Sequence, residues 1–190
     1  MSKKDMIKDA SIKLIARDGY FNATTDKISK EANVAVGTIY NYFSSKEEIL
    51  NYIFDTELQK RYNFYNNMKN WHMDWFLKIN GILNFHLQEM RKEPDISKII
   101  LSEKINAHRY NMSSLIKFSQ LSLIISDILQ QGINEEKIRS CDVKTISLII
   151  SGFLDAITYE FATTDDFDDI EYAIDEFCTL LKNGLVALSH

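Results

Sequence analysis

The side chains best suited to specific chemistry in this sequence gather in one short segment, residues 23–48. Hydroxyl, phenol and amide groups follow one another there with almost no charge: Thr38, Tyr40, Asn41 and Tyr42. Groups of this kind hydrogen-bond to phosphate oxygens and to the edges of base pairs. They are what a helix needs in order to enter the major groove of DNA.

Two short helices must position these side chains. Thr24 or Thr25 can cap the first helix, and the second is expected over residues 36–43. The unit would pack through Ile28, Ala32, Val34, Ile39 and Phe43. Val36 and Gly37 then face outward with the polar group. In a helix-turn-helix the second helix lies in the major groove while the first crosses the backbone.

Longer helices flank this pair. The first is indicated by an apolar face of Ile7, Ala10, Ser11, Leu14 and Ile15, ended by Gly19. Asn33 marks the turn between the short helices. Residues 45–48 read as a capping box that opens a long helix through Leu50, Phe54, Leu58, Tyr62 and Tyr65. We place the domain boundary in this helix, with a DNA-binding domain at 1–46 and a second, larger domain at 47–190.

Charge is distributed unevenly along the chain. The net charge is −5, yet residues 1–46 carry a balance of +3 and residues 47–190 a balance of −8. A basic head on an acidic body fits attraction to phosphate at one end only. Because a +3 excess is small, charge alone is weak support for DNA binding.

The remainder of the chain predicts further helices and no strand, giving an all-α protein of about nine helices. One proline and six glycines among 190 residues favour helices over turns. One helix is expected through His72, Phe76, Ile79, Leu83, His86 and Met90, ended by Pro94. Others are expected over about 96–109 and about 113–131, the latter stopped by Gly132. Two final stripes follow: Val143, Ile146, Ile150, Phe153, Ile157, and then Ile170, Ile174, Phe177, Leu181, Leu185, Leu188.

The segment from Gly19-Tyr20 through Thr24-Thr25 to VGTIYNYFSSKEEIL at 36–50 resembles the N-terminal signature of the TetR family of bacterial transcriptional repressors. The resemblance covers about residues 4–50. It implies a homodimer with a three-helix DNA-binding head and a C-terminal domain that binds a small effector. By match to the family, Thr24 and Thr25 would meet phosphates and Val36 and Gly37 would approach base edges. The backbone contacts would come mainly from Thr38, Tyr40, Asn41, Tyr42 and Lys46.

One position departs from the family pattern. Family members often carry Lys, Arg or Gln where this chain has Val36. Valine makes no bidentate hydrogen bond to a base, although it can contact a thymine methyl group. Base specificity is therefore expected to depend on DNA shape, Tyr40 and Asn41.

The two last helices predict the dimer interface. Residues 145–154 (TISLIISGFL) are apolar nearly all round, so this helix needs cover on more than one side. A four-helix interface across a two-fold axis would use Ile146, Ile150, Phe153, Ile157, Ile174, Phe177 and Leu181. Such a dimer would place two recognition helices on a palindromic operator. The alternative is a core helix within one protomer.

An effector site is expected in the body, in an apolar pocket with few polar groups. The candidate lining is Phe76, Leu83, His86, Met90, Tyr110 and Phe118. His86 is the best polar candidate, although a lone histidine on an apolar face is more often a satisfied core residue. The aromatic, apolar composition favours a lipophilic effector such as an acyl chain or a hydrophobic drug, whereas the overall acidity would suit a cation; the sequence leaves this choice open.

Other functions fit less well. The four histidines lack metal-ligand spacing, and no P-loop, dinucleotide or nucleophile-elbow motif occurs, so neither an enzyme nor a cofactor is predicted. The chosen function is a repressor that a small effector releases from DNA. The main alternative is a small-molecule sensor that does not act through DNA. The start of the chain lacks the apolar region of a secretory signal, and the longest uncharged run in the apolar helices is too short to span a bilayer. The two cysteines are expected to be reduced thiols. The protein is therefore expected in the cytoplasm.

Overall fold

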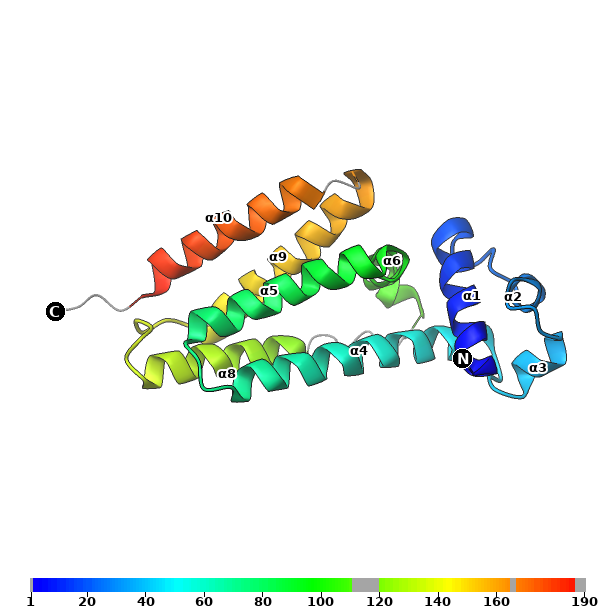
Figure 1. Cartoon of the computed structure of the whole chain (residues 1–190), viewed down its shortest axis with the longest axis horizontal. Coiled ribbons are helices and arrows are strands. Elements are labelled where there is room, and N and C mark those ends of the chain that lie inside the picture. Colours follow the sequence, from blue (N-terminus) through cyan, green and yellow to red (C-terminus); the bar gives the residue numbers. More distant parts are fainter. Residues whose placement is uncertain (1, 111–119, 165–166, 187–190) are drawn as a thin grey trace. The chain divides into compact units, whose positions relative to one another are not determined.

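The structure, a computed structural model, describes residues 2–110, 120–164 and 167–186, and only the backbone of residues 103–110. Nine helices and no strand occur in these residues, which confirms the predicted all-α fold (Figure 1). The helices are α1 (Lys3–Asp18), α2 (Thr25–Glu31), α3 (Val36–Tyr40), α4 (Lys46–Asn70), α5 (Trp75–Lys92), α6 (Pro94–Tyr110), α8 (Leu121–Asn134), α9 (Val143–Thr164) and α10 (Phe167–Leu185).

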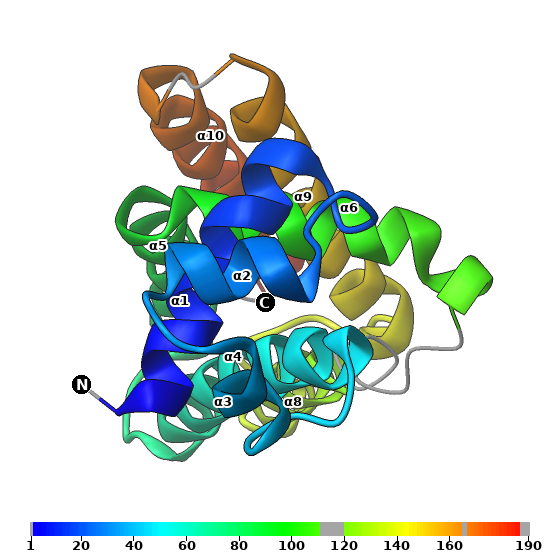
Figure 2. The ribbon, with the colours of Figure 1, turned by 90° about the vertical axis from the view of Figure 1, so that its right-hand side faces the viewer.

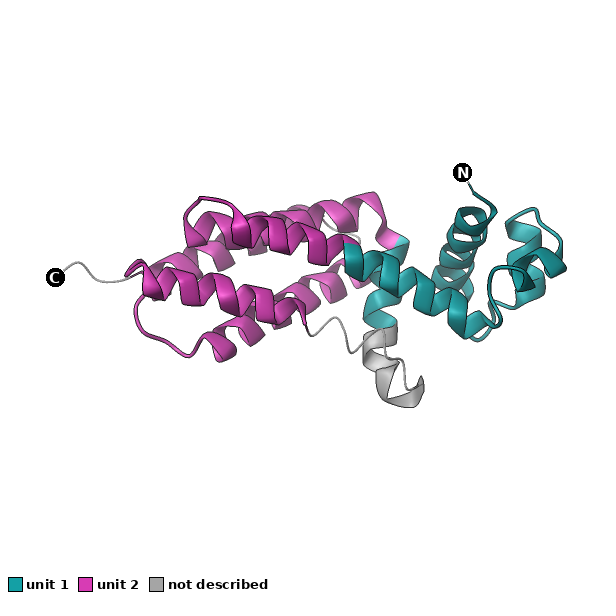
Figure 3. Cartoon of the chain, turned by 90° about the horizontal axis from the view of Figure 1, so that it is seen from below, with its two compact units in different colours: residues 1–59, 95–115 teal, residues 60–94, 116–190 magenta. Residues whose placement is uncertain are grey.

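The helices form two compact units (Figure 3). Unit 1 comprises residues 1–59 and 95–115, and unit 2 comprises residues 60–94 and 116–190. Helix α4 contributes its first part to unit 1 and its remainder to unit 2. Helix α6 clusters with the three N-terminal helices, although it lies far from them in the sequence. The predicted functional division at residue 46 stays a prediction.

Unit 1 is built on the predicted face of α1. Its five predicted residues are all buried: Ile7, Ala10, Ser11, Leu14 and Ile15. Gly19 ends α1 with φ +80°, a backbone conformation that other residues rarely adopt. Asn33 also has a positive φ, at the predicted turn between α2 and α3. Figure 2 shows α1, α2 and α3 grouped together at the near side of the view.

Local capping explains where the short helices begin. Thr24 caps α2, with its hydroxyl accepting from the backbone N–H of Lys27 at 3.4 Å. The Ser45 hydroxyl accepts from the N–H of Glu48 at 3.2 Å, as a capping residue of α4. The predicted capping box is only half present, because the Glu48 carboxylate accepts from the N–H and hydroxyl of Ser44 instead. Ser44 offers two donors to that carboxylate, which satisfies it locally.

Three predicted boundaries in unit 2 are corrected by the structure. His72 precedes α5, which starts after the Asp74 cap. Pro94 opens α6, where its missing N–H costs nothing, in addition to ending α5. Gly132 does not stop α8 but lies buried inside it, where an added Cβ would come within 2.5 Å of Ile138 and 3.2 Å of Trp75. Close packing therefore requires glycine at position 132.

The body of unit 2 is formed by α5, α8, α9 and α10, which pack on one another. Its core includes Ile79, Ile82, Leu83, Ile128, Leu129 and Ile150, each at most 1% exposed. Helix α9 is also long and apolar enough to cross a membrane by length and composition, with a third of its most apolar window buried. Core helices of soluble proteins meet the same criterion, so this property is weak support for a membrane span.

Candidate nucleic-acid interface and effector site

Helix α3 turns one apolar side chain inward and presents polar and aromatic groups outward. Ile39 is 1% exposed, whereas Tyr40 is 55% and Tyr42 is 42% exposed. Gly37 and Asn41 are also exposed, and Val36 and Thr38 are half-buried. The helix ends at Tyr40, earlier than predicted, because the N–H groups of Asn41 and Tyr42 close a turn. Every member of the predicted outward set is thus at least partly exposed.

Gly37 has no internal reason to be a glycine. A Cβ added there would meet nothing within 4 Å, and its φ is not positive. Glycine in a helix is destabilising by about 0.5–1 kcal/mol relative to alanine. A glycine that neither packing nor backbone geometry requires is consistent with close approach of an external partner to the helix backbone.

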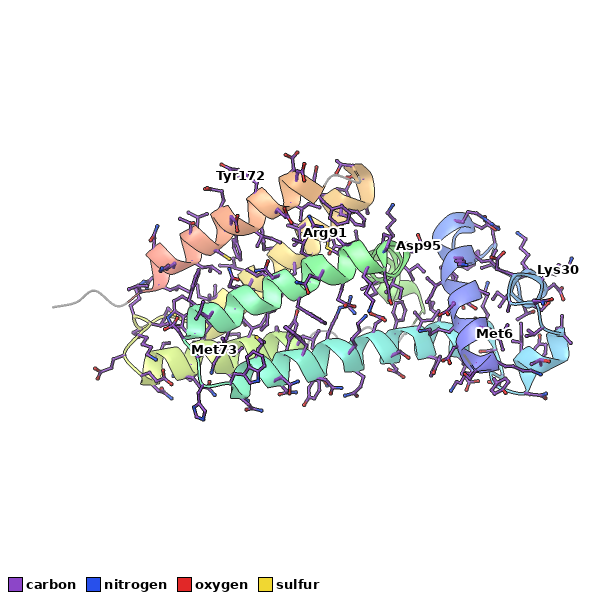
Figure 4. The ribbon with its side chains drawn as sticks, viewed as in Figure 1. Met6, Lys30, Met73, Arg91, Asp95 and Tyr172 are labelled. Atoms are coloured by element: carbon purple, nitrogen blue, oxygen red, sulfur yellow. The ribbon has the colours of Figure 1, made fainter. Side chains whose placement is uncertain are left out.

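The start of α2 supplies a second group of candidate contacts. Thr24 is exposed and Thr25 is half-buried. The Thr24 oxygen is occupied as an acceptor by the helix cap, which leaves its O–H as a donor. Lys30, on the last turn of α2, is exposed and projects outward (Figure 4). Lys30 is not among the DNA-binding residues predicted from the sequence. The only sequence feature that pointed to it was the excess of positive charge in residues 1–46.

Lys46 does not point outward like the other predicted DNA-binding residues. Its ammonium donates to the carbonyl oxygens of Tyr20 at 2.7 Å and Phe21 at 3.3 Å. It also lies 4.2 Å above the centroid of the Tyr20 ring. Partial burial lowers the pKa of the Lys46 ammonium. This predicted phosphate ligand is thus engaged with the loop between α1 and α2.

The predicted effector residues have different environments in unit 2. Leu83 and Met90 are fully buried in α5, and Phe76 is half-buried with the Lys182 ammonium 5.3 Å from its ring centroid. The half-buried His86 has Nε2 at 2.8 Å from the Thr158 hydroxyl. The Tyr110 side chain and Phe118 lie outside the described residues. Their roles in binding an effector stay predictions.

A pocket of about 530 Å³ lies elsewhere in unit 2 and contains none of the predicted effector residues. It is lined by Lys69, Asn70, Trp71, His72, Met73, Asp74, Lys78, Gln131, Glu135 and Lys137. The buried Lys78 donates to the Lys69 carbonyl at 2.8 Å and to the Gln131 side chain at 3.2 Å, near the C-terminal ends of α4 and α8. Cations are favourable at helix C-termini, so Lys78 has a structural role there.

The predicted dimer residues lie mainly on the inner side of α9 and α10. Four are buried within the single chain, namely Ile150, Ile157, Ile174 and Leu181, and Ile146 is half-buried. Phe153 and Phe177 stack on each other with ring centroids 3.9 Å apart. The outward sides of these helices carry other apolar residues, with Leu148 and Leu180 each 69% exposed. Tyr172, 68% exposed, projects outward from α10 (Figure 4).

This arrangement defines an all-helical helix-turn-helix protein with a separate helical body. Residues 7–53 match a family model described as bacterial regulatory proteins, tetR family. The "Fatty acid metabolism regulator protein" of Bacillus subtilis (strain 168) is 26% identical over 186 residues, which cover 94% of this chain and 93% of that protein. Over residues 7–53 the chain therefore carries the N-terminal segment of the TetR family of bacterial regulatory proteins.

Solved structures show the same fold. The transcriptional regulator FadR from Bacillus subtilis, in complex with stearoyl-CoA, superposes with a TM-score of 0.79 at 25% identity. The match covers 95% of this chain and 98% of that one. FadR from Bacillus halodurans superposes with a TM-score of 0.81 at 23% identity, over 97% of this chain and 96% of that one.

Proposed function

We propose that this protein is a homodimeric transcriptional repressor that binds a palindromic operator and is released by a fatty acyl effector. The observation that carries the DNA-binding part is the outward side of α3 and of the turn that follows it, which carries the unpacked Gly37 and the exposed Tyr40 and Tyr42. Exposed aromatic groups of this kind call for a partner. Phenol and amide groups on one helix fit phosphates and base edges.

The test of DNA binding is a titration of the protein with DNA from upstream of its own gene, over a series of salt concentrations. Selective binding with a steep salt dependence is expected. Tyr42→Ala should weaken binding at least tenfold, because it removes an exposed phenol from the proposed interface. Tyr62→Ala is the matched control, since Tyr62 on α4 is 43% exposed against 42% for Tyr42.

Two results would contradict the proposal. Equal affinity of the Tyr42→Ala and Tyr62→Ala proteins would remove the α3 face from the interface. No selective binding to any fragment of the source genome would favour the sensor that does not act through DNA.

The proposed dimer uses the outward sides of α9 and α10. Leu148 and Ile149 on α9 and Leu180 on α10 are at least half exposed, although they are large apolar side chains. Gly152 lies on the same helix as the first two, and a Cβ added there would meet nothing within 4 Å. A second copy of the chain would cover these groups, with the buried residues Ile150, Ile157, Ile174 and Leu181 holding the two helices to the body.

The effector proposal rests on the relatives and on the composition of the body. One relative is named a fatty acid metabolism regulator, and a FadR of the same fold was solved with stearoyl-CoA. The core of unit 2 is rich in Ile and Leu, and the half-buried His86 pairs with the buried Thr158 as a polar group beside it. An apolar wall with a few polar anchors suits an acyl chain that ends in a polar group.

The effector is tested by release of the bound operator. Stearoyl-CoA should release it, whereas coenzyme A without an acyl chain should not. His86→Phe should raise the concentration needed for release, because it removes a polar anchor and keeps the volume similar. His72→Phe is the control, since His72 is exposed before α5. Release by neither stearoyl-CoA nor free stearate would exclude an acyl effector.

Release is proposed to act through a shift between two conformations. An effector that binds one conformation more tightly raises its population, and no release follows without such a difference in affinity. Helix α4 is continuous from the capped start at Ser45 into unit 2, so a tilt of this helix would reach the head. A repressor of this kind would act on DNA in the cytoplasm.

A further inference from the structure

The contacts of Lys46 indicate a role other than binding phosphate. Two of the three ammonium N–H donors point to the carbonyl oxygens of Tyr20 and Phe21. The charge lies over the Tyr20 ring, and Tyr20 itself is buried. These carbonyls lie 26 and 25 positions before Lys46 in the sequence, so the contacts join the start of α4 to the loop between α1 and α2.

That loop leads directly into α2. The N–H of Ala23 donates to Gly19 at 3.2 Å, and the N–H of Thr24 donates to Asn22 at 3.1 Å. Ala23 is fully buried, and Thr24 then caps α2. The position of residues 20 and 21 therefore sets where α2 begins. Lys46 holds these residues against the first turn of α4, which directly follows α3 and its connecting turn.

We propose that Lys46 is a positioning residue that sets the spacing between the start of α2 and the DNA-facing side of α3, and does not neutralise a phosphate. The proposal rests on the DNA-binding function proposed above. In this proposal Lys46 contributes to operator affinity by fixing the loop between α1 and α2. Exposed lysines of the head, such as Lys30, supply the positive charge that attracts DNA.

Salt dependence separates the two roles. Removing one lysine–phosphate ion pair makes the slope of log affinity against log salt shallower by about 0.9. Lys46→Met keeps an unbranched, largely aliphatic side chain but removes the charge and the donors. We expect it to weaken operator binding about tenfold with an unchanged salt slope. Lys30→Met, the control, removes an exposed head lysine and should reduce the slope by about 0.9 for each protomer.

A second measurement uses the protein without DNA. Hydrogen exchange at the amides of Ala23 and Thr24 should accelerate at least tenfold in Lys46→Met, while the amides of α9 exchange as in the native protein. Lys46→Arg should restore both the protection and the affinity, because a guanidinium can donate to two carbonyls and stack on a ring. This readout does not require the protein to bind DNA, so it separates the positioning role from the proposed function.

The outcomes are distinct. If Lys46→Met makes the slope of log affinity against log salt as shallow as Lys30→Met does, and leaves hydrogen exchange at Ala23 and Thr24 unchanged, the proposal is overturned and Lys46 is a phosphate ligand. Acceleration across α9 as well would show a general loss of stability and would also overturn it. If the native protein binds no operator, the function fails, and faster exchange confined to the loop would still support the positioning contact.

Discussion

At the level of single residues, Gly37 shows most directly how stability and function separate. Its position in α3 is open, and a methyl group would meet no neighbouring atom. Gly37→Ala should raise the free energy of unfolding by up to about 1 kcal/mol, because alanine loses less backbone entropy on folding. The same methyl group should weaken operator binding at least tenfold by keeping DNA from the helix backbone.

Thermal unfolding and operator titration would measure both effects. Gly184→Ala is the control, since a Cβ at Gly184 also meets nothing and that residue lies near the end of α10, outside the proposed DNA-binding face. It should leave DNA affinity unchanged. Full affinity in Gly37→Ala would mean that DNA does not approach this backbone.

Tyr65 gives a prediction about pH. Burial, with a smaller contribution from Asp155 and an opposing one from Arg61, raises the pKa of Tyr65 to about 12. A tyrosine in the unfolded chain loses its proton near pH 10. The contribution of Tyr65 to the free energy of unfolding is therefore complete below pH 10 and is lost as the pH rises towards 12. The loss amounts to at most about 3 kcal/mol, since each pH unit contributes about 1.36 kcal/mol.

Urea unfolding at pH 8, 9.5 and 11 would measure this loss. Tyr65→Phe should flatten the decline, whereas Tyr62→Phe, a change at an exposed residue of the same helix, should not. Identical pH profiles for the two variants would show that Tyr65 does not cause the decline.

At the level of elements, helix ends follow from local chemistry. The Ser45 hydroxyl accepts from the Glu48 N–H and so satisfies one free donor at the start of α4. Ser45→Ala should lower the free energy of unfolding by about 1 kcal/mol. Urea denaturation would measure it against Ser140→Ala, a change in an exposed residue before α9. Equal stability of the two variants would show that the cap contributes nothing.

Helix α8 shows where element prediction fails. A glycine near the end of an apolar stripe is a common stop signal, and the sequence pattern predicts such a stop at Gly132. In the structure α8 continues to Asn134, and Gly132 has a packing role instead, since Ile138 and Trp75 fill the space that a side chain would need. Both neighbours lie outside the helix, so its own apolar pattern could not reveal them.

For the molecule as a whole, the central prediction is the dimer. Leu148→Glu and Leu180→Glu each place a charge on an apolar residue that is 69% exposed in one protomer. Each should convert the dimer to a folded monomer, because burial of an unpaired carboxylate is unfavourable. Operator affinity should fall with it, since two heads would no longer bind together.

Sedimentation equilibrium would measure the mass, and circular dichroism the helix content. Leu123→Glu on α8 is the matched control, at 62% exposure, and should remain dimeric. A native protein that sediments as a monomer would contradict the proposed assembly. Dimers of both Leu148→Glu and Leu180→Glu would place the interface on another face.

The presence of the helices, the turn at Asn33 and the outward side of α3 could be predicted from the sequence, whereas the ends of α3, α5 and α8 could not. These features depend on contacts between residues a few positions apart, such as the Thr24 cap and the stripe from Ile7 to Ile15. The exposure of Tyr40 and Tyr42 was predictable for the same reason, because the pattern of a short amphipathic helix shows which side chains cannot face the core. Their role in DNA binding stays a prediction.

Tertiary packing sets where Lys46 points and which sides of α9 and α10 stay exposed. A helical pattern groups residues on one face, but it does not say which face meets the core when both are apolar. Thus Ile150 is buried while Leu148 is exposed. The contact of Lys46 with Tyr20 likewise spans 26 positions of the sequence and exists only when α1 and α4 are packed together.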